Sequence, residues 1–97
     1  MIESAQVAIY RYPVVLFTRT DYPECMSANE LLKKTFGFDP YVLFLDQIPE
    51  GPEIEDFLAQ YDHQRSVTNV FIAGKYVGNF EAIVQLDQSG ELEEKLE

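Results

Sequence analysis

The chain has 97 residues, 46% of them hydrophobic and 13% aromatic, a composition that predicts one folded domain over residues 1–97 and excludes general disorder. Seventeen acidic against seven basic residues give a formal net charge of −10, which repels phosphate backbones and anionic lipids, so we expect neither nucleic acid nor a membrane as a partner. The single cysteine excludes an internal disulfide and a cysteine-rich metal site, and it favours a reducing, cytoplasmic location. No apolar run approaches the roughly 20 residues that span a bilayer, and we expect no secretory signal at the N-terminus.

The first two predicted elements are a helix over residues 2–10 and a strand over residues 14–18. One of two apolar pairs faces the core from the helix, either Val7 with Tyr10 or Ile2 with Ile9. Pro13 ends the helix, because proline lacks the N–H that a further turn would use. The strand is a short β-rich apolar run, which predicts burial on both faces of a sheet.

A second helix is predicted to open at Pro23, which suits a first helical position because the missing N–H would have no partner there. Thr20 or Asp21 can accept hydrogen bonds from the N–H groups of the first turn. Gly37 can adopt the left-handed conformation that ends a helix. The apolar stripe of this helix comprises Ala28, Leu31, Leu32 and Phe36.

The only cysteine, Cys25, falls in the first turn of this helix. The positive end of the helix dipole favours a thiolate there, so the thiol is a candidate redox centre. Glu24 beside it opposes thiolate formation. The alternative is a partly buried and inert thiol, and we favour that alternative.

The rest of the chain continues the alternation of strands and helices. An apolar strand at residues 41–45 follows the second helix, and a strand, a helix and a strand in succession predict a parallel right-handed unit. Further elements are a helix over residues 52–62, strands over 67–72 and 76–77 joined by a turn at 73–75, a helix capped by Asn79, and an acidic helical segment at 90–97. Together they predict an α/β fold with a mixed four-stranded sheet between helices.

Four segments match one known family in order and spacing. They are TRTDYPEC (residues 18–25), HQRSVTNVF (63–71), AGKYVGNFEA (73–82) and LDQSGEL (86–92). Over nearly its whole length the chain resembles a glutaredoxin, whose pattern has Cys-Pro-Tyr-Cys at the start of the helix. The resemblance implies a thioredoxin-like fold and the activity of a glutathione-dependent thiol–disulfide oxidoreductase.

The resemblance places Tyr22 at the family's nucleophilic cysteine and Cys25 at the second, resolving cysteine. A phenol cannot carry out thiol–disulfide exchange, so the implied activity is at most a weak one through Cys25. The alternative is a redox-inactive member that acts as a protein-interaction or regulatory module. A further alternative comes from glutathione transferases, which share the fold and in which a tyrosine near this turn donates a hydrogen bond to the glutathione thiolate.

Eight further positions correspond to the family's glutathione groove: Arg19, Gln64, Arg65, Val67, Thr68, Gly78, Asn79 and Glu81. Thr68 replaces a proline that is cis in the family. A cis bond before a non-proline costs about 2.5–4 kcal/mol, so we expect a trans bond between Val67 and Thr68. Asn79 stands where the family has a glycine. Ala82 stands where the family has an aspartate, and Glu81, one residue earlier, is a candidate substitute for that aspartate. We therefore expect glutathione to bind weakly.

No metal or iron–sulfur cluster is expected. The single histidine, His63, lies in a polar stretch and is expected to be solvated. Some single-cysteine glutaredoxins hold an iron–sulfur cluster through the cysteine that Tyr22 replaces. The expected partners are therefore glutathione or another protein, and we expect the chain to be a monomer.

Overall fold

A mixed four-stranded sheet of order β2-β1-β3-β4 forms the centre of the computed structural model, which describes the backbone of residues 3–96 and the side chains of residues 5–96. The inner strands are β1 (Val14–Thr18) and β3 (Asn69–Ile72), and the edge strands are β2 (Tyr41–Phe44) and β4 (Lys75–Gly78). β1 runs parallel to β2 and antiparallel to β3, and β3 forms an antiparallel hairpin with β4. The predicted parallel unit and the predicted hairpin are both confirmed.

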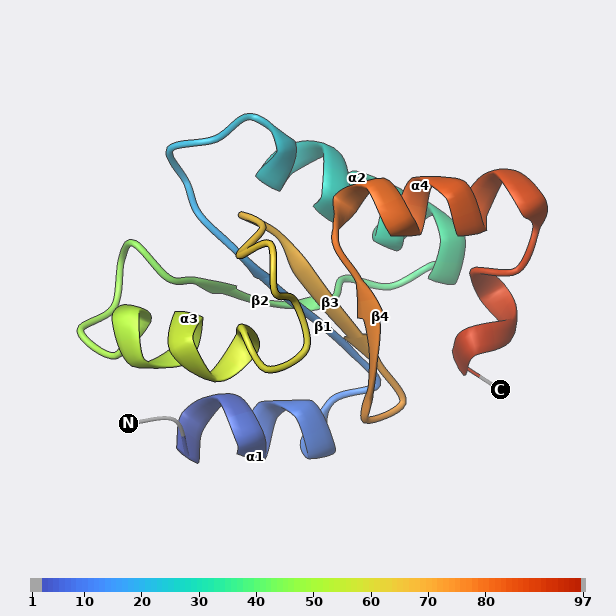
Figure 1. Ribbon diagram of the computed structural model, residues 1–97. Helices are drawn as coiled ribbons and strands as arrows, with labels where there is room; N and C mark the ends of the chain where they lie inside the picture. The colour runs from blue at the N-terminus through green and yellow to red at the C-terminus, as the bar shows by residue number, and fades with distance from the viewer. Residues whose placement is uncertain (1–2, 97) are drawn as a thin grey trace.

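The described residues contain four α-helices and a short 3-10 helix: α1 (Glu3–Arg11), α2 (Glu24–Phe36), α3 (Gly51–Leu58), α4 (Phe80–Ser89) and η1 (Glu93–Leu96). In Figure 1, α1 and α3 lie on one face of the sheet and α2 and α4 on the other. This arrangement confirms the predicted fold, a mixed four-stranded sheet flanked by helices.

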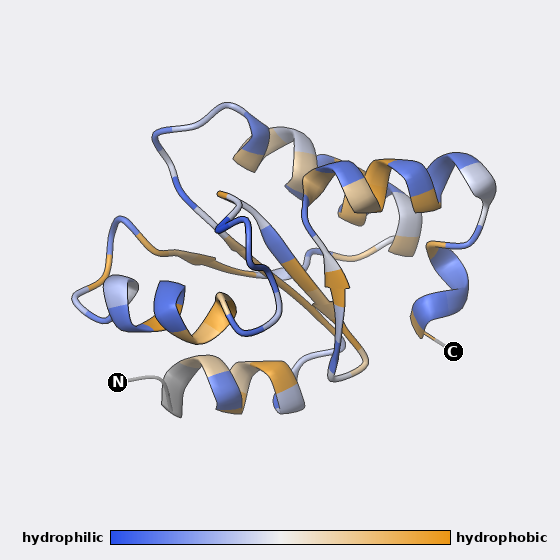
Figure 2. Ribbon diagram, in the orientation of Figure 1, coloured by the Kyte–Doolittle hydropathy of each residue, from blue (hydrophilic) through white to orange (hydrophobic). Residues whose placement is uncertain are grey.

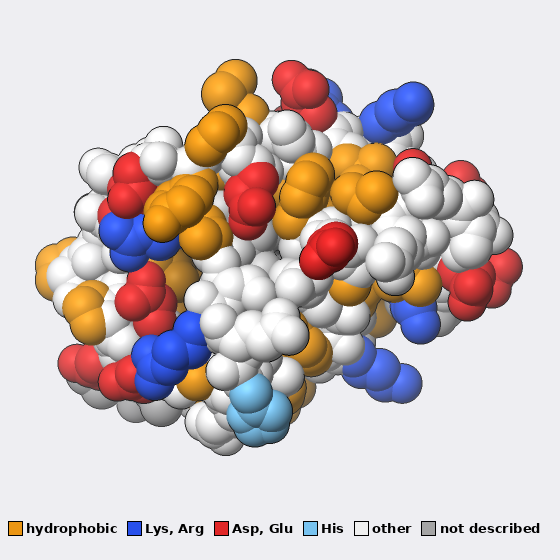
Figure 3. Space-filling view, turned by 45° about the horizontal axis from the view of Figure 1, so that its top comes forward, with side chains coloured by type: hydrophobic (Ala, Val, Ile, Leu, Met, Phe, Trp, Pro, Cys, Tyr) orange, Lys and Arg blue, Asp and Glu red, His pale blue; other side chains and the backbone are white. Residues whose placement is uncertain are grey.

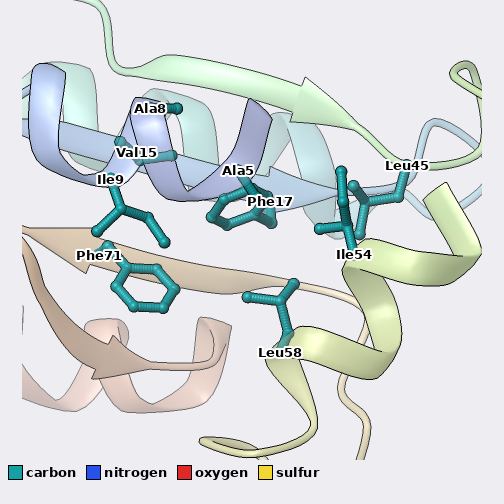
Figure 4. Close-up of a cluster of buried hydrophobic side chains, with 9 residues drawn as sticks. All are labelled: Ala5, Ala8, Ile9, Val15, Phe17, Leu45, Ile54, Leu58 and Phe71. Carbon is teal, nitrogen blue, oxygen red and sulfur yellow. The ribbon is translucent and has the colours of Figure 1, made fainter. Parts of the chain in front are cut away.

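Each face of the sheet carries its own hydrophobic cluster, because successive residues of a strand point to opposite faces. In β1, Val15 and Phe17 pack toward α1 and α3, whereas Val14 and Leu16 pack toward α2 and α4. Figure 4 shows the first cluster, made of Ala5, Ala8, Ile9, Val15, Phe17, Leu45, Ile54, Leu58 and Phe71. In Figure 2 the central strands are coloured as hydrophobic, whereas the loop that follows β1 is mostly hydrophilic. The prediction that β1 is covered on both faces is therefore confirmed.

The face of α1 that packs against the sheet is not the one predicted by the first alternative, the pair Val7 and Tyr10. Val7 and Tyr10 are 56% and 84% exposed, so their predicted burial is wrong. The buried face consists of Ala5, Ala8 and Ile9, which follow the spacing of one helical face. The second alternative is right for Ile9, and its Ile2 lies outside the described residues.

The apolar strand after α2 lies at an edge of the sheet, although its sequence resembles that of β1. Tyr41 and Phe44 are each 37% exposed. Tyr12 covers part of this edge by stacking on Tyr41, with ring centroids 4.1 Å apart. A continuous apolar run therefore does not separate an edge strand from a central one.

Two predicted boundaries shift around Asp62. The helix predicted over residues 52–62 ends at Leu58, and the strand predicted from residue 67 begins at Asn69. The buried carboxylate of Asp62 accepts hydrogen bonds from the backbone N–H groups of Gln64, at 3.2 Å, and Ser66, at 2.6 Å. Such local bonds compete with regular structure, so the chain forms an ordered loop here. The remaining boundaries agree with prediction to within a few residues.

Candidate functional site

A cleft of about 300 Å³ lies between the β1–α2 loop, α3 and the α3–β3 loop. Figure 1 shows these segments at the same end of the sheet, beyond the C-terminal end of β1. Four of the predicted site residues line the cleft: Arg19, Tyr22, Arg65 and Val67. Three acidic residues that were not among the predicted site residues line it as well: Asp21, Glu55 and Asp62.

The other predicted site residues do not line this cleft: Cys25, Gln64, Thr68, Gly78, Asn79 and Glu81. Gln64 and Glu81 have exposed side chains, whereas Thr68 is fully buried. The structure therefore gathers only part of the predicted set around one cavity.

Tyr22 and Cys25 occupy different environments although both belong to the turn that opens α2. Tyr22 is 47% exposed and lines the cleft. Cys25 lies in the first turn of α2 with a half-buried side chain, and its N–H donates to the carbonyl of Tyr22 at 3.3 Å. The group that this turn presents to the cleft is thus a phenol rather than a thiol.

The predicted side-chain cap of α2 is wrong. The residue that precedes the helix is Pro23, in helical conformation, and its side chain makes no capping hydrogen bond. Asp21 instead pairs with Arg19, and Thr20 binds a carboxylate that follows β2. The end of α2 agrees with prediction, because Gly37 adopts the left-handed conformation at φ 80°.

Asp46 anchors the β1–α2 loop to the end of β2. Its carboxylate accepts hydrogen bonds from the hydroxyl and the N–H of Thr20, at 2.5 Å and 3.0 Å, and from the amide of Gln47 at 3.3 Å. These bonds favour the ionised carboxylate, with the Thr20 hydroxyl contributing most, and lower the pKa of Asp46 to about 2. These bonds therefore hold the β1–α2 loop, which carries Arg19 and Tyr22, beside the end of β2.

Two carboxylates, those of Asp21 and Glu55, bind the guanidinium of Arg19. Its Nε and Nη2 donate to the two oxygens of Asp21 at 3.1 Å and 3.0 Å, and its Nη1 donates to Glu55 at 3.0 Å. Hydrogen bonds to Asp21 and then to Glu55 raise the pKa of Arg19 above its ordinary value. The bond to Glu55 links the β1–α2 loop to α3 across the cleft.

Arg65 enters the cleft from the α3–β3 loop. Its backbone adopts a left-handed conformation at φ 53°, and its Nη2 donates to Asp56 of α3 at 3.0 Å. The hydrogen bonds that Asp62 accepts from the backbone hold this loop in place.

Burial, and then the charge of Asp62, raise the pKa of Tyr76, whose phenol donates to Asn69 at 2.9 Å.

Thr68 pairs with the end of β1. Its side-chain hydroxyl lies 3.0 Å from that of Thr18, and both residues are fully buried. The bond between Val67 and Thr68 is trans, as expected. Val67 therefore lines the cleft just outside the ladder of β3.

The side chain of Asn79 caps the first turn of α4. The side-chain oxygen of Asn79 accepts a hydrogen bond from the N–H of Ala82 at 2.9 Å, which confirms the predicted cap. The side-chain nitrogen of Asn79 donates to the Ser66 hydroxyl at 3.2 Å. Gly78 precedes it at φ 147°, and a Cβ there would meet the Cβ of Ala82 at 2.6 Å.

Within residues 3–96 no group of three or more histidine, cysteine, aspartate or glutamate side chains is arranged to hold a metal ion. His63 is exposed in the α3–β3 loop. Among the described helices, none combines the length and the apolar character needed to cross a bilayer.

The strand order, the helices on both faces and a cleft beside the turn that opens α2 define a thioredoxin-like fold. The family model described as Glutaredoxin matches residues 14–77. A chloroplastic glutaredoxin-C5 of Arabidopsis thaliana is 34% identical over 94 residues, and the chain spans 96% of its own length but 53% of that relative. A glutaredoxin of Vernicia fordii is 35% identical over 88 residues, which are 91% of this chain and 84% of that protein.

Solved structures agree with this result. A crystal structure of a buckwheat glutaredoxin–glutathione complex matches with a TM-score of 0.88 at 30% identity, covering 98% of this chain and 86% of that one. The chain belongs to the glutaredoxin family.

Proposed function

We propose that this protein is a glutaredoxin with a degenerate active site, which supports at most weak glutathione-linked thiol–disulfide exchange through Cys25. One observation carries the proposal: Tyr22 faces the cleft from the turn that opens α2, whereas Cys25 does not line the cleft. The position that holds the attacking thiol in the family is filled by a phenol, which has no redox chemistry with a disulfide. We also propose that the chain acts in the cytoplasm as a monomer.

The exchange through Cys25 follows ordinary thiol chemistry. The Cys25 thiolate attacks the glutathione sulfur of a mixed disulfide, a new Cys25–glutathione disulfide forms, and the partner leaves as a thiolate. A second glutathione thiolate then attacks the adduct, which restores Cys25 and releases glutathione disulfide. The half-buried position of Cys25 limits the first attack, because a displacement at sulfur needs in-line access.

Weak binding of glutathione fits the contents of the cleft. Arg19, Arg65 and Val67 line it and correspond to the family's contacts with the tripeptide. Gln64 lies outside the lining, and the side chain of Asn79 is engaged as a helix cap. The buckwheat relative is described in complex with glutathione, which supports the same ligand class here.

The test is to measure Cys25 directly. We expect thiol-selective alkylation of Cys25 near neutral pH, and we expect incubation with glutathione disulfide to give a partial adduct whose mass maps to Cys25. Cys25→Ser is the control and should lose both signals. If Cys25 alkylates no faster than a free cysteine and Cys25→Ser reduces a mixed disulfide as well as the unchanged protein does, the redox proposal fails.

A second candidate is a redox-inactive module that binds a protein partner. It is favoured by two large hydrophobic side chains left open beside the turn, Tyr22 at 47% and Met26 at 68% exposure. Hydrophobic side chains gather on the face that Figure 3 shows. Under this candidate, partner binding should survive Cys25→Ser and weaken in Met26→Asp, while mixed-disulfide reduction stays at background. Strong turnover by the unchanged protein would exclude it.

A further inference from the structure

The guanidinium of Arg19 is already occupied by carboxylates of the chain itself. Asp21 takes the edge formed by Nε and Nη2 through two parallel bonds, and Glu55 takes Nη1. Arg19 is 32% exposed, and Asp21 and Glu55 are 51% and 37% exposed, so solvent reaches the network, and all three residues line the cleft. The two carboxylates come from different elements, the β1–α2 loop and α3.

An arginine recognises an external carboxylate through the same two-pronged edge. Asp21 already occupies this edge of Arg19. A carboxylate ligand must therefore either displace Asp21 or bind to the remaining N–H groups of the guanidinium. The approach is also opposed by the charges of Asp21, Glu55 and Asp62, which all line the cleft. On the left of the face shown in Figure 3, basic side chains lie directly beside acidic ones.

We infer that Asp21 and Glu55 are specificity-determining residues that compete inside the molecule with the carboxylates of a small thiol ligand for Arg19. This inference rests on the proposed binding of a glutathione-type ligand in the cleft. Its consequence is a preference of the site: a free anionic tripeptide is disfavoured, and a thiol carried on a polypeptide segment without free carboxylates is favoured.

The second arginine of the cleft is held less firmly. Arg65 pairs with Asp56 through a bond of 3.0 Å, but the two side chains are 61% and 72% exposed. Exposed single pairs are weak because water and salt screen them. Arg19, with a two-bond pair and a third bond from α3, is therefore the position where internal competition is strongest.

The experiment titrates the protein with S-methylglutathione, which cannot form a disulfide with Cys25, and follows binding by NMR and calorimetry. The variants are Asp21→Asn and Glu55→Gln. Glu30→Gln, at an exposed site on α2 outside the cleft lining, removes one charge and serves as the matched control. We expect binding about tenfold tighter in Asp21→Asn and about threefold tighter in Glu55→Gln, because a two-bond charged pair is stronger than a single one.

A second ligand distinguishes competition for Arg19 from a general change in the shape of the cleft. The diester of S-methylglutathione has no free carboxylates, so its affinity should not rise in any of the three variants. Tighter binding of the acid in Glu30→Gln, or unchanged affinity in both cleft variants, would overturn the inference while leaving the cleft as the ligand site. Failure of both ligands to bind any of the proteins would overturn the inference together with the proposed glutathione site.

Discussion

Thr18 and Thr68 share a hydrogen bond of 3.0 Å between their side-chain hydroxyls, although they lie 50 positions apart in the chain and neither is exposed to solvent. Thr18 is the last residue of β1, and Thr68 directly precedes β3. The bond therefore joins the two segments that lead into the cleft. It also gives Thr68 a structural task at the position where the resemblance places a proline.

This pairing predicts coupled effects on stability. Thr68→Val keeps the shape of the side chain but leaves the Thr18 hydroxyl buried without a partner, and we expect a loss of about 1–3 kcal/mol in the free energy of unfolding. The double variant Thr18→Val/Thr68→Val should lose less than the sum of the single variants, because it removes both polar groups. Urea unfolding measures all three, and strictly additive losses would show that the hydroxyls do not interact.

Gly78 predicts a second effect on stability, at the entry to α4. Its φ of 147° is open mainly to glycine, and an added Cβ would meet the Cβ of Ala82 at 2.6 Å. We expect Gly78→Ala to cost about 2–4 kcal/mol, from backbone strain and overpacking together. Gly37→Ala is the matched control, since Gly37 also has positive φ but no atom within 4 Å of an added Cβ. Equal losses in the two variants would show that crowding against Ala82 is absent.

We predict that the stability of the loop that carries Arg19 and Tyr22 depends on pH through the ionisation of Asp46. Hydrogen bonds from Thr20 lower the pKa of Asp46 from an ordinary value of 3.8 to about 2. A carboxyl with a lowered pKa in the folded state stabilises the fold fully above pH about 4, and the contribution disappears as the pH falls through about 2. Carbon-detected NMR should give a titration midpoint near 2 for Asp46, returning toward 3.8 in Thr20→Val. A midpoint near 3.8 in the unchanged protein would contradict the contacts.

Local sequence signals were sufficient for most of the fold. β1 was predicted to the residue because its apolar run is bounded by Pro13 and a polar turn. Gly37 and Asn79 were placed correctly at helix ends, since the geometry of a helix terminus depends on a few neighbouring residues. The parallel pairing of β1 and β2 followed from the general handedness and length of such connections.

Features that depend on distant parts of the chain were missed. The buried face of α1 and the edge position of β2 depend on which elements pack beside them, and hydrophobicity alone does not encode this. In the site, Asp62 was missed because its carboxylate acts through backbone groups of a loop. Glu55 was missed because only the fold brings it to Arg19, which lies 36 positions away in the chain.

The central claim is that the fold of a glutaredoxin active site is kept while Tyr22 has replaced its reactive thiol. Reduction of a glutathione mixed disulfide, measured for the unchanged protein, Tyr22→Cys and Tyr22→Cys/Thr68→Pro, tests this claim most directly. Circular dichroism must first show that each variant is folded, because Thr68→Pro also removes the partner of Thr18. We predict at most weak turnover for the unchanged protein and a clear increase only when both changes are present. Strong turnover by the unchanged protein, abolished by Cys25→Ser, would contradict the account.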